Sequence, residues 1–164
     1  MKVALLMGSD SDLKRLESLL GHLKELEIDH EARVLSAHRT PDLLLEYVKE
    51  APGRGVRVFI CAAGGAAHLA GVVASHTLLP VIGVPMDNPP LGGLDALLAT
   101  AQMPGGIPVA TVGVGGGGPA NAALFAARIL ALSDPELASR LEAFKNEMVV
   151  KVLAKDEKVR SSVG

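Results

Sequence analysis

The sequence predicts an α/β protein in which a flavodoxin-like, doubly wound parallel sheet of about five strands lies between two helical layers, followed by a long C-terminal helix. Short apolar, β-rich runs alternate five times with helical patterns along the 164 residues, and this rhythm is typical of parallel strands joined by helical crossovers. Several runs are apolar at successive positions, as expected for strands covered on both faces. Hydrophobic residues make up 49% of the chain, which suits a globular domain of common size.

The first half of the chain carries three expected strands and two expected helices. Apolar residues fill Val3 to Met7, and leucines then recur at helical spacing from Leu13 to Leu26. Residues 28–34 alternate as in a strand. Pro41 stands where the first turn of a helix accepts proline, ahead of a helical pattern that continues to Lys49. We expect the third strand at Val56 to Cys61.

The second half continues the alternation. We expect a glycine-opened helix over roughly 64–77, a strand at Val81 to Val84 and a helix at Leu91 to Ala101. A fifth strand is expected at Val109 to Val114, and a further helix at Ala120 to Leu132. Sheets of this kind bind ligands beyond the carboxyl ends of their strands, so the turns after the strands are where we expect chemistry.

The C-terminal segment breaks the alternation. After Pro135, apolar residues recur at helical spacing and no strand follows. Because each strand already has a helix to cover it, we expect residues 134–164 to pack on a neighbouring subunit, with 156–164 frayed. Residues 1–133 are expected to form one α/β domain.

Composition and motifs exclude several classes of function. The net charge is -2 and only 2% of residues are aromatic, so we expect no nucleic-acid partner. One cysteine, Cys61, leaves no internal disulfide and no multi-cysteine zinc site. The N-terminal apolar run is too short for a signal sequence and no stretch could span a bilayer, so we expect a cytoplasmic protein without a membrane partner. Nucleotide-triphosphate, serine-hydrolase and zinc-protease motifs are missing, and we expect no metal.

The turn after the first strand reads GSDSD and offers anion-binding groups. Gly8 permits a tight turn, and the free N–H groups of the following helix start favour an anion. Ser9 adds a hydroxyl, whereas Asp12 is too acidic for phosphate and suits sugar hydroxyls. Ser9 and Asp12 also match a capping box, so plain helix capping stays open as the alternative.

The turn after the second strand, SAHRTP, gathers polar groups of three kinds. Ser36 and Thr40 offer hydroxyls, and Arg39 offers a planar donor fork that suits phosphate. His38 is the group in this turn that exchanges protons near neutral pH. A solvated surface loop is the alternative interpretation.

The turn after the third strand contains Gly64, Gly65, Ala66 and His68. Glycines and small alanines let backbone amides approach a ligand and leave room for a flat ring. His68 is expected one turn into the following helix. The alternative is close packing of helix on sheet, with His68 buried and hydrogen-bonded.

The remaining candidate groups are fewer. Residues 85–90, PMDNPP, are stiff and are expected to form a wall. We interpret His22, His30 and His76 as structural or surface residues, and Cys61 as a buried thiol. Phosphate anchoring, a small backbone-lined space and one or two histidines suit proton transfer on a phosphorylated small molecule, without metal or redox cofactor.

The motifs resemble those of a known family, the class I N5-carboxyaminoimidazole ribonucleotide mutases of purine biosynthesis. The matching segments run in order along the domain: GSDSD (8–12), SAHRTP (36–41), GGAAHL (64–69), LPVIGVP (79–85), GLDALL (93–98), QMPGGIPVATV (102–112) and NAAL (121–124). Ala62 and Ala70 depart from the family pattern, which has glycine and proline there.

The resemblance implies an enzyme that moves a carboxylate from the exocyclic N5 of the substrate to ring carbon C4 by decarboxylation and recarboxylation, without metal, ATP or biotin. His38 matches the family's acid/base histidine. By the same resemblance Ser9, Ser36 and Arg39 hold the phosphate, and Asp12 binds ribose hydroxyls. The segment from Gly64 to Leu69, with Gly65, Ala66 and His68, lines the ring and the carboxylate.

The resemblance also implies a homo-octamer with sites near subunit contacts, and functional coupling to the ATP-dependent synthetase that makes the N5-carboxylated substrate. Two other functions stay open. One is direct carboxylation of aminoimidazole ribonucleotide by CO2. The other is a non-catalytic module of flavodoxin-like fold that binds a phosphorylated metabolite or flavin mononucleotide, although the scarcity of aromatic residues disfavours a stacked flavin.

Overall fold

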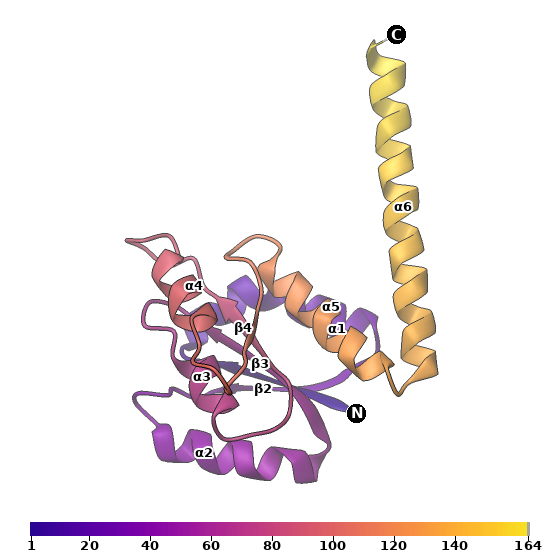
Figure 1. Cartoon of the computed structure of the whole chain (residues 1–164). Helices are drawn as coiled ribbons and strands as arrows, with labels where there is room; N and C mark the ends of the chain where they lie inside the picture. The colour runs from indigo at the N-terminus through magenta and orange to yellow at the C-terminus, as the bar shows by residue number, and fades with distance from the viewer. Residues whose placement is uncertain (164) are drawn as a thin grey trace.

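The computed structural model describes residues 1–163 and contains one sheet of five parallel strands in the order β2-β1-β3-β4-β5 (Figure 1). This order confirms the flavodoxin-like doubly wound fold. The strands are β1 (Lys2–Met7), β2 (Asp29–Val34), β3 (Val56–Ala63), β4 (Val81–Pro85) and β5 (Ala110–Thr111).

The strand register brings the turns after the strands to one edge of the sheet. Met7, at the end of β1, pairs with Val34 of β2 and with Ala62 of β3. Ala63, at the end of β3, pairs with Pro85 of β4. The turns that begin at residues 8, 35, 64 and 86 therefore start side by side.

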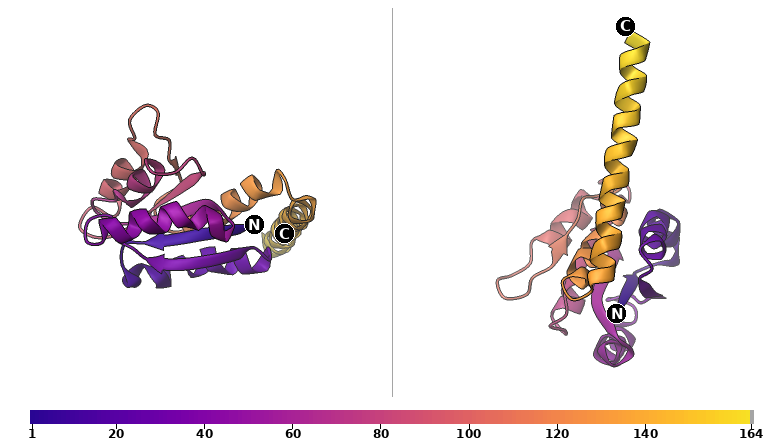
Figure 2. Two further views of the ribbon diagram at one scale, coloured as in Figure 1. Left: turned by 90° about the horizontal axis from the view of Figure 1, so that it is seen from below. Right: turned by 90° about the vertical axis from the view of Figure 1, so that its right-hand side faces the viewer.

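Helices cover both faces of the sheet, as the views in Figure 2 show. They are η1 (Asp10–Leu16), α1 (Glu17–Glu25), α2 (Pro41–Glu50), η2 (Ala51–Arg54), α3 (Leu69–Ala74), α4 (Leu94–Ala101), α5 (Gly118–Ala131) and α6 (Pro135–Val163), where η marks a 3-10 helix. Alternate residues of β1 enter two apolar cores. Leu5 packs with residues of α1 and α5, whereas Leu6 packs with residues of α2 and α3. Both cores exclude water from the sheet, which stabilises the three-layer arrangement.

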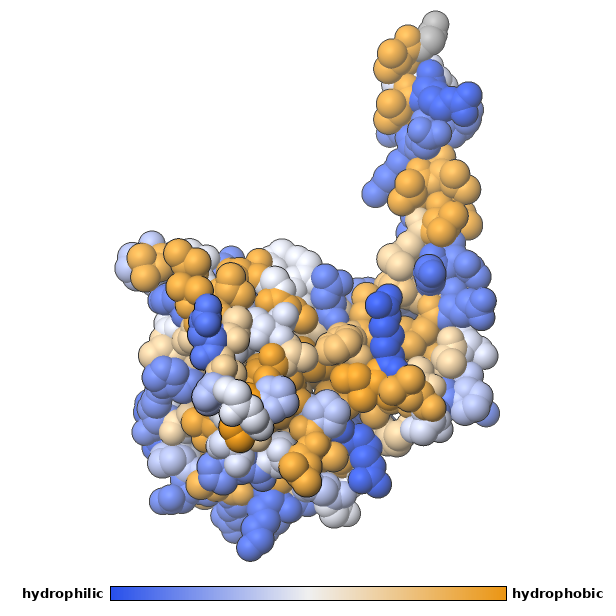
Figure 3. All heavy atoms as spheres, viewed as in Figure 1, coloured by the Kyte–Doolittle hydropathy of each residue, from blue (hydrophilic) through white to orange (hydrophobic). Residues whose placement is uncertain are grey.

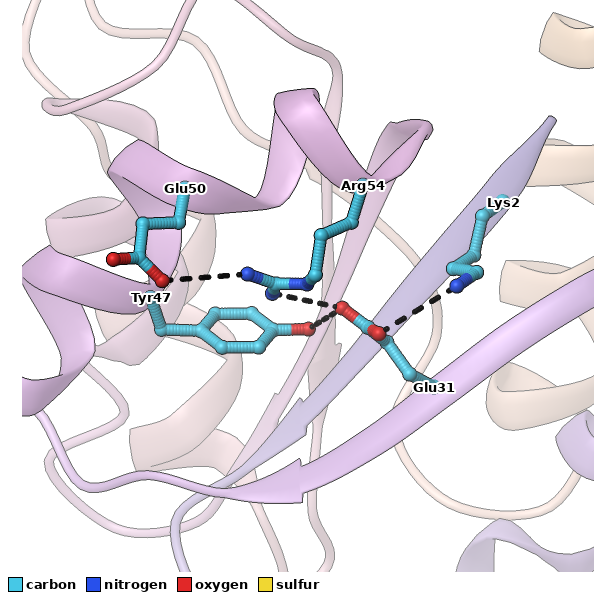
Figure 4. Close-up of polar contacts among 5 residues, drawn as sticks. All are labelled: Lys2, Glu31, Tyr47, Glu50 and Arg54. Atoms are coloured by element: carbon cyan, nitrogen blue, oxygen red, sulfur yellow. Dashed lines mark hydrogen bonds and ion pairs between the residues drawn. The ribbon is translucent and has the colours of Figure 1, made fainter.

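A polar cluster around Glu31 holds the edge strand β2 at the end of the sheet opposite the turns (Figure 4). Glu31 Oε1 accepts hydrogen bonds from Tyr47 Oη at 2.6 Å and from Arg54 Nη2 at 3.0 Å. Lys2 Nζ lies 3.7 Å from Glu31 Oε2. Burial alone would raise the pKa of Glu31, but the hydrogen bonds from Tyr47 and Arg54 outweigh it and the pKa is lowered. The cluster therefore favours the ionised carboxylate.

Several expected boundaries differ from the structure: α3 ends at Ala74 instead of 77, α4 begins at Leu94 instead of Leu91, and three further differences follow. Residues 64–68 form a non-helical turn and α3 begins only at Leu69, so the glycines do not open a helix and His68 precedes it. The fifth strand is two residues long instead of six, although the Val112 amide beyond it still donates to the Gly83 carbonyl of β4 at 3.1 Å. The C-terminal helix continues to Val163 without fraying; Gly164 lies outside the described residues.

The long helix α6 packs on its own domain only near its start. Leu137 is buried, Leu141 and Phe144 pack partly against the α1–α5 core, and Arg140 Nε donates to the carbonyl of Leu26 at 2.9 Å. The rest projects from the domain in Figures 1 and 2, and Figure 3 shows apolar side chains along it. The large exposed apolar residues of this part are Met148, Val149, Val150, Val152, Leu153, Val159 and Val163. Within residues 1–163, no helix is both long and apolar enough to cross a bilayer.

Candidate active site

A cavity of about 300 Å³ opens where the turns after β1, β2, β3 and β4 meet. Its lining residues come from all four turns and from the start of α3: Gly8, Ser9, Ser11, Asp12, Ser36, Ala37, His38, Arg39, Ala63, Gly64, Ala66, Leu69 and Asn88. Eight of the ten site residues expected from the sequence line it. The other two, Gly65 and His68, belong to the same β3–α3 turn, and His68 contacts the lining through His38.

The β1 turn presents hydroxyls and one carboxylate. Ser9 is the N-cap of η1 and accepts hydrogen bonds from the Ser11 amide at 3.3 Å and from the Ser11 hydroxyl at 2.9 Å. Ser9 is therefore a helix cap as the alternative expected, although its side chain bonds to Ser11 instead of the Asp12 amide that a capping box requires, and the same serine also lines the cavity. Asp12 is only 5% exposed. Its burial raises the pKa of its carboxyl, and the nearby charge of Arg15 opposes that rise in pKa only in part.

The β2 turn is fixed by its own hydroxyls. Ser36 Oγ accepts from the backbone amides of His38 at 3.3 Å and Arg39 at 3.2 Å, while Thr40 Oγ1 accepts from the Ser36 amide at 2.9 Å. Arg39 Nη2 donates to the carbonyl of Gly8 at 2.6 Å, so its guanidinium ties the β2 turn to the β1 turn. A guanidinium has five N–H donors in all, so Arg39 keeps donors for an anion at this edge of the sheet.

The two histidines expected in the site contact each other. Nε2 of His38 lies 2.9 Å from Nδ1 of His68, and the ring planes meet at 87° with centroids 4.9 Å apart. His68 is the N-cap residue of α3, and it follows Gly65, whose φ of +60° turns the chain. Because a hydrogen bond needs one donor and one acceptor nitrogen, one ring of the pair donates an N–H hydrogen bond to the other.

The other histidines bond away from the cavity. Nδ1 of His22 contacts the Glu25 carboxylate at 3.0 Å, Nδ1 of His30 contacts the Ile28 carbonyl at 2.9 Å, and Nδ1 of His76 contacts the Val72 carbonyl at 2.9 Å. These contacts confirm their interpretation as structural or surface residues. Cys61 is buried as expected, and burial raises the pKa of its thiol, which keeps the thiol protonated.

The β4 turn contributes Asn88, which sequence reasoning treated only as part of a wall. Arg15 Nη1 donates a hydrogen bond to Asn88 Oδ1 and lies 3.3 Å from Asp87 Oδ1. The sequence did hold a signal for Asn88: it is a polar residue shortly after a buried strand, on the turn next to the β3 turn. The two departures from the family pattern lie in the packed interior, because Ala62 is fully buried in β3 and Ala70 is 2% exposed in α3.

These groups can bind a phosphorylated, partly flat molecule and exchange protons with it. Arg39 and the serine hydroxyls donate to oxyanions, Asp12 accepts from hydroxyls, and His38 lines the cavity. Within residues 1–163, no group of three histidine, cysteine or acidic side chains is placed to hold a metal ion.

Comparison with known proteins gives consistent matches along the chain. The sequence model of one family, described as AIR carboxylase, matches residues 2–151. N5-carboxyaminoimidazole ribonucleotide mutase of Saccharolobus solfataricus is 52% identical over 153 residues, covering 93% of this chain and 96% of that protein. The mutase of Thermotoga maritima is 48% identical, covering 96% and 91%. The mutase of Mycobacterium tuberculosis strain H37Rv is 47% identical, covering 99% and 92%.

Solved structures agree with the sequence comparisons. The crystal structure of Treponema denticola PurE superposes with a TM-score of 0.87 at 32% identity, covering 96% of this chain and 97% of that one. A point variant of PurE2 from the same organism gives the same TM-score of 0.87 at 31% identity, covering 96% of each chain.

Proposed function

We infer that the chain is an N5-carboxyaminoimidazole ribonucleotide mutase of purine biosynthesis, because it belongs to the AIR carboxylase family and is 47–52% identical to mutases over most of its length. It is an intramolecular transferase. The substrate is a ribonucleotide, with a phosphate, a ribose, an imidazole ring and a carboxylate to be recognised. The observation that carries the assignment in the structure is His38, which lines the same cavity as Arg39, Ser36 and Ser9.

We propose that His38 moves the proton that the reaction requires. When the bond from N5 to the carboxylate carbon breaks, CO2 forms and the electron pair stays on N5, which takes a proton from His38. C4 then attacks the CO2 carbon, and the proton on C4 returns to the imidazole as the ring regains its aromaticity. A positioned histidine contributes ~10²–10⁴-fold to such a step near neutral pH. Recapture requires that the CO2 stay in the cavity beside C4, because its escape would waste the intermediate.

We propose that different turns bind different parts of the substrate. Ser9, Ser36 and Arg39 would hold the phosphate, because they supply hydroxyls and a guanidinium at the junction of the β1 and β2 turns. Asp12 would accept hydrogen bonds from ribose hydroxyls. The β3 turn, with Gly64, Gly65, Ala66, His68 and Leu69, would line the ring and its carboxylate. No metal or cofactor has a part in these roles.

We propose that the enzyme is a homo-octamer in which residues 134–164 pack on a neighbouring subunit, apart from the contacts that the start of α6 makes with residues 1–133. Two features support association. The strand β2 is an edge strand and Val34 is 52% exposed, and the apolar side chains after Phe144 on α6 lie exposed on their own subunit. A cytoplasmic location and functional coupling to the ATP-dependent synthetase are proposed from the nature of the substrate, an unstable intermediate of biosynthesis.

Separate assays with each substrate test the function. The wild-type protein should convert N5-carboxyaminoimidazole ribonucleotide to the C4-carboxylated product without added bicarbonate. Conversion of aminoimidazole ribonucleotide only with bicarbonate would instead show direct carboxylation, and binding without turnover of either substrate would show a non-catalytic module. His38→Asn should keep the fold and substrate affinity but lose at least ~10²-fold in kcat. Retention of more than about a tenth of the rate would contradict the role of His38.

A further inference from the structure

Among the side chains given roles above, only His68 is assigned near the carboxylate and could donate to it, and its Nδ1 is already in contact with Nε2 of His38 at 2.9 Å. Arg39 is the only guanidinium or ammonium group among the lining residues, and its proposed partner is the phosphate. Asp12 repels an anion. Of the side chains that remain around the cavity, Asn88 alone carries an amide, which donates two N–H groups without a net charge.

The orientation of the Asn88 amide follows from its neighbours. A guanidinium only donates, so the oxygen of the amide must face Arg15 and the nitrogen must point away from it. The nitrogen lies against Gly64, because a Cβ placed on Gly64 would come within 2.0 Å of Asn88 Nδ2. Gly64 belongs to the β3 turn and lines the cavity. The amide nitrogen is therefore presented at the part of the cavity that the ring and its carboxylate are proposed to occupy.

Arg15 is itself held in place. Its Nη1 lies 3.3 Å from Asp87 Oδ1, and Asp87 packs against Gly115 of the loop before α5, where an added Cβ would come within 3.2 Å of Asp87 Oδ2. Gly115 has a φ of +59°, so a larger residue would be strained there as well. Three segments far apart in the sequence thus fix one amide at the rim of the cavity.

We propose that Asn88 is a substrate-binding residue that recognises the carboxylate, with Arg15 as the residue that positions its amide. This inference rests on the proposed function. A neutral donor suits a carboxylate that must leave as CO2, because a cation would stabilise the charged group most strongly in the ground state and so raise the barrier to decarboxylation. A hydrogen bond from the amide orients the carboxylate while leaving the bond to nitrogen free to break.

The test compares two ribonucleotides that share the phosphate and ribose but differ in the carboxylate. Dissociation constants of aminoimidazole ribonucleotide and of the C4-carboxylated product are measured on wild type, Asn88→Ala and Asn88→Asp. Asn88→Ala should weaken binding of the carboxylated ligand by ~10–100-fold, the worth of a hydrogen bond to a charged group. Affinity for aminoimidazole ribonucleotide should change less than about twofold. Asn88→Asp preserves the shape but repels an anion. It should therefore lower the affinity for the carboxylated ligand, relative to that for aminoimidazole ribonucleotide, more than Asn88→Ala does.

Control variants separate recognition from structure. Asn121→Ala removes an exposed amide of α5 outside this cavity and should leave both affinities unchanged. Arg15→Met keeps the apolar stem but removes the hydrogen bond that orients the amide of Asn88. It should weaken binding of the carboxylated ligand less than Asn88→Ala does. The assignment would be overturned if Asn88→Ala weakened the binding of both ligands equally, or weakened the binding of neither. Failure of the wild-type protein to bind either ribonucleotide would instead overturn the proposed function.

Discussion

His38 and His68 share a contact of 2.9 Å between Nε2 and Nδ1, although thirty positions separate them in the sequence. The contact joins the turns after β2 and β3, whose strands lie on either side of β1. Because both partners are imidazoles, either ring can donate the hydrogen bond, depending on which tautomer each ring adopts. The contact therefore orients the ring of His38.

We predict that loss of His68 impairs turnover more than binding. His68→Ala removes the partner that orients the His38 ring, and misplacement of a catalytic group costs up to ~10²-fold in rate. We expect kcat to fall by roughly ten- to a hundredfold with KM changed less than about threefold, and the pH profile of kcat to change shape. Steady-state kinetics over a range of pH values around neutrality measure both effects.

A conservative variant checks that interpretation. His68→Asn keeps a side-chain amide that can contact Nε2 of His38 but cannot exchange a proton near neutral pH. It should restore part of the lost kcat, while its pH profile stays like that of His68→Ala. If both variants instead raised KM and left kcat unchanged, His68 would be a substrate-binding residue without influence on His38.

We predict that Arg39 acts on affinity through its shape as well as its charge. Arg39→Ala should weaken ribonucleotide binding by ~10²-fold or more, because it removes charge-assisted hydrogen bonds and the link to the Gly8 carbonyl. Arg39→Lys keeps the charge but loses the planar fork, so it should recover only part of the affinity. Calorimetric titration with the product measures both, and an affinity for Arg39→Ala equal to that of the wild type would rule out the phosphate role.

The sequence predicted the fold and most of the site because its strongest signals are local. The apolar strands, the helical spacing of α2 and the turn sequences after β1 and β2 each depend on a few neighbouring residues. Parallel pairing then brings the strand ends together whatever the details of the helices. The family resemblance implied that Arg39, Ser36 and Ser9 act together, and the cavity lining brings them together with His38, as expected for turns at the carboxyl ends of parallel strands.

What sequence reasoning missed depends on tertiary contacts. The turn at Gly64 and Gly65 is non-helical, and a Cβ on Gly64 would collide with the Asn88 side chain, a neighbour that is distant in sequence. The contact of His38 with His68 and that of Arg15 with Asn88 likewise join segments that no local pattern relates. The end of the C-terminal helix was predicted too early because its polar last turns were interpreted as frayed, although lysine and glutamate are good helix formers.

We predict that the Asp12 carboxylate serves substrate binding and lowers the stability of the folded protein. Burial raises the pKa of its carboxyl in the folded protein above the ordinary value of 3.8. At neutral pH the carboxylate is therefore charged in a buried position that disfavours the charge, and this lowers the free energy of unfolding. Asp12→Asn should therefore be more stable than wild type at neutral pH, and this gain should vanish as the pH falls below about 3.8, where both states of the wild type are protonated. The same variant should bind ribonucleotides more weakly.

Denaturant unfolding at several pH values, together with ligand titration, measures the two effects of Asp12→Asn. Asp10→Asn is the matched control, because Asp10 lies on the same 3-10 helix but is exposed. It should alter stability and affinity little. A variant Asp12→Asn that is less stable than wild type at neutral pH would show that the carboxylate has stabilising partners that outweigh its burial.

The last prediction concerns the polar cluster at the other end of the sheet (Figure 4). The lowered pKa of Glu31 means that the folded state favours its ionised form, so the stability it contributes is complete at pH values above its ordinary 4.5 and is lost as the pH falls through the lowered folded value. Glu31→Gln should reduce the free energy of unfolding at neutral pH by about 1 kcal/mol, or roughly 2–4 °C in Tm. The difference from wild type should shrink steadily below pH 4.5.

Glu50→Gln is the matched control for this cluster, because the Glu50 carboxylate contacts the same Arg54 at 3.6 Å from a side chain that is 63% exposed. Ion pairs of such exposure contribute little to stability, so this variant should unfold like the wild type at every pH. Equal losses in the two variants would mean that Arg54 itself holds the edge strand in place. The larger loss expected for Glu31→Gln instead assigns that role to the hydrogen bonds that Tyr47 and Arg54 donate to one partly buried carboxylate.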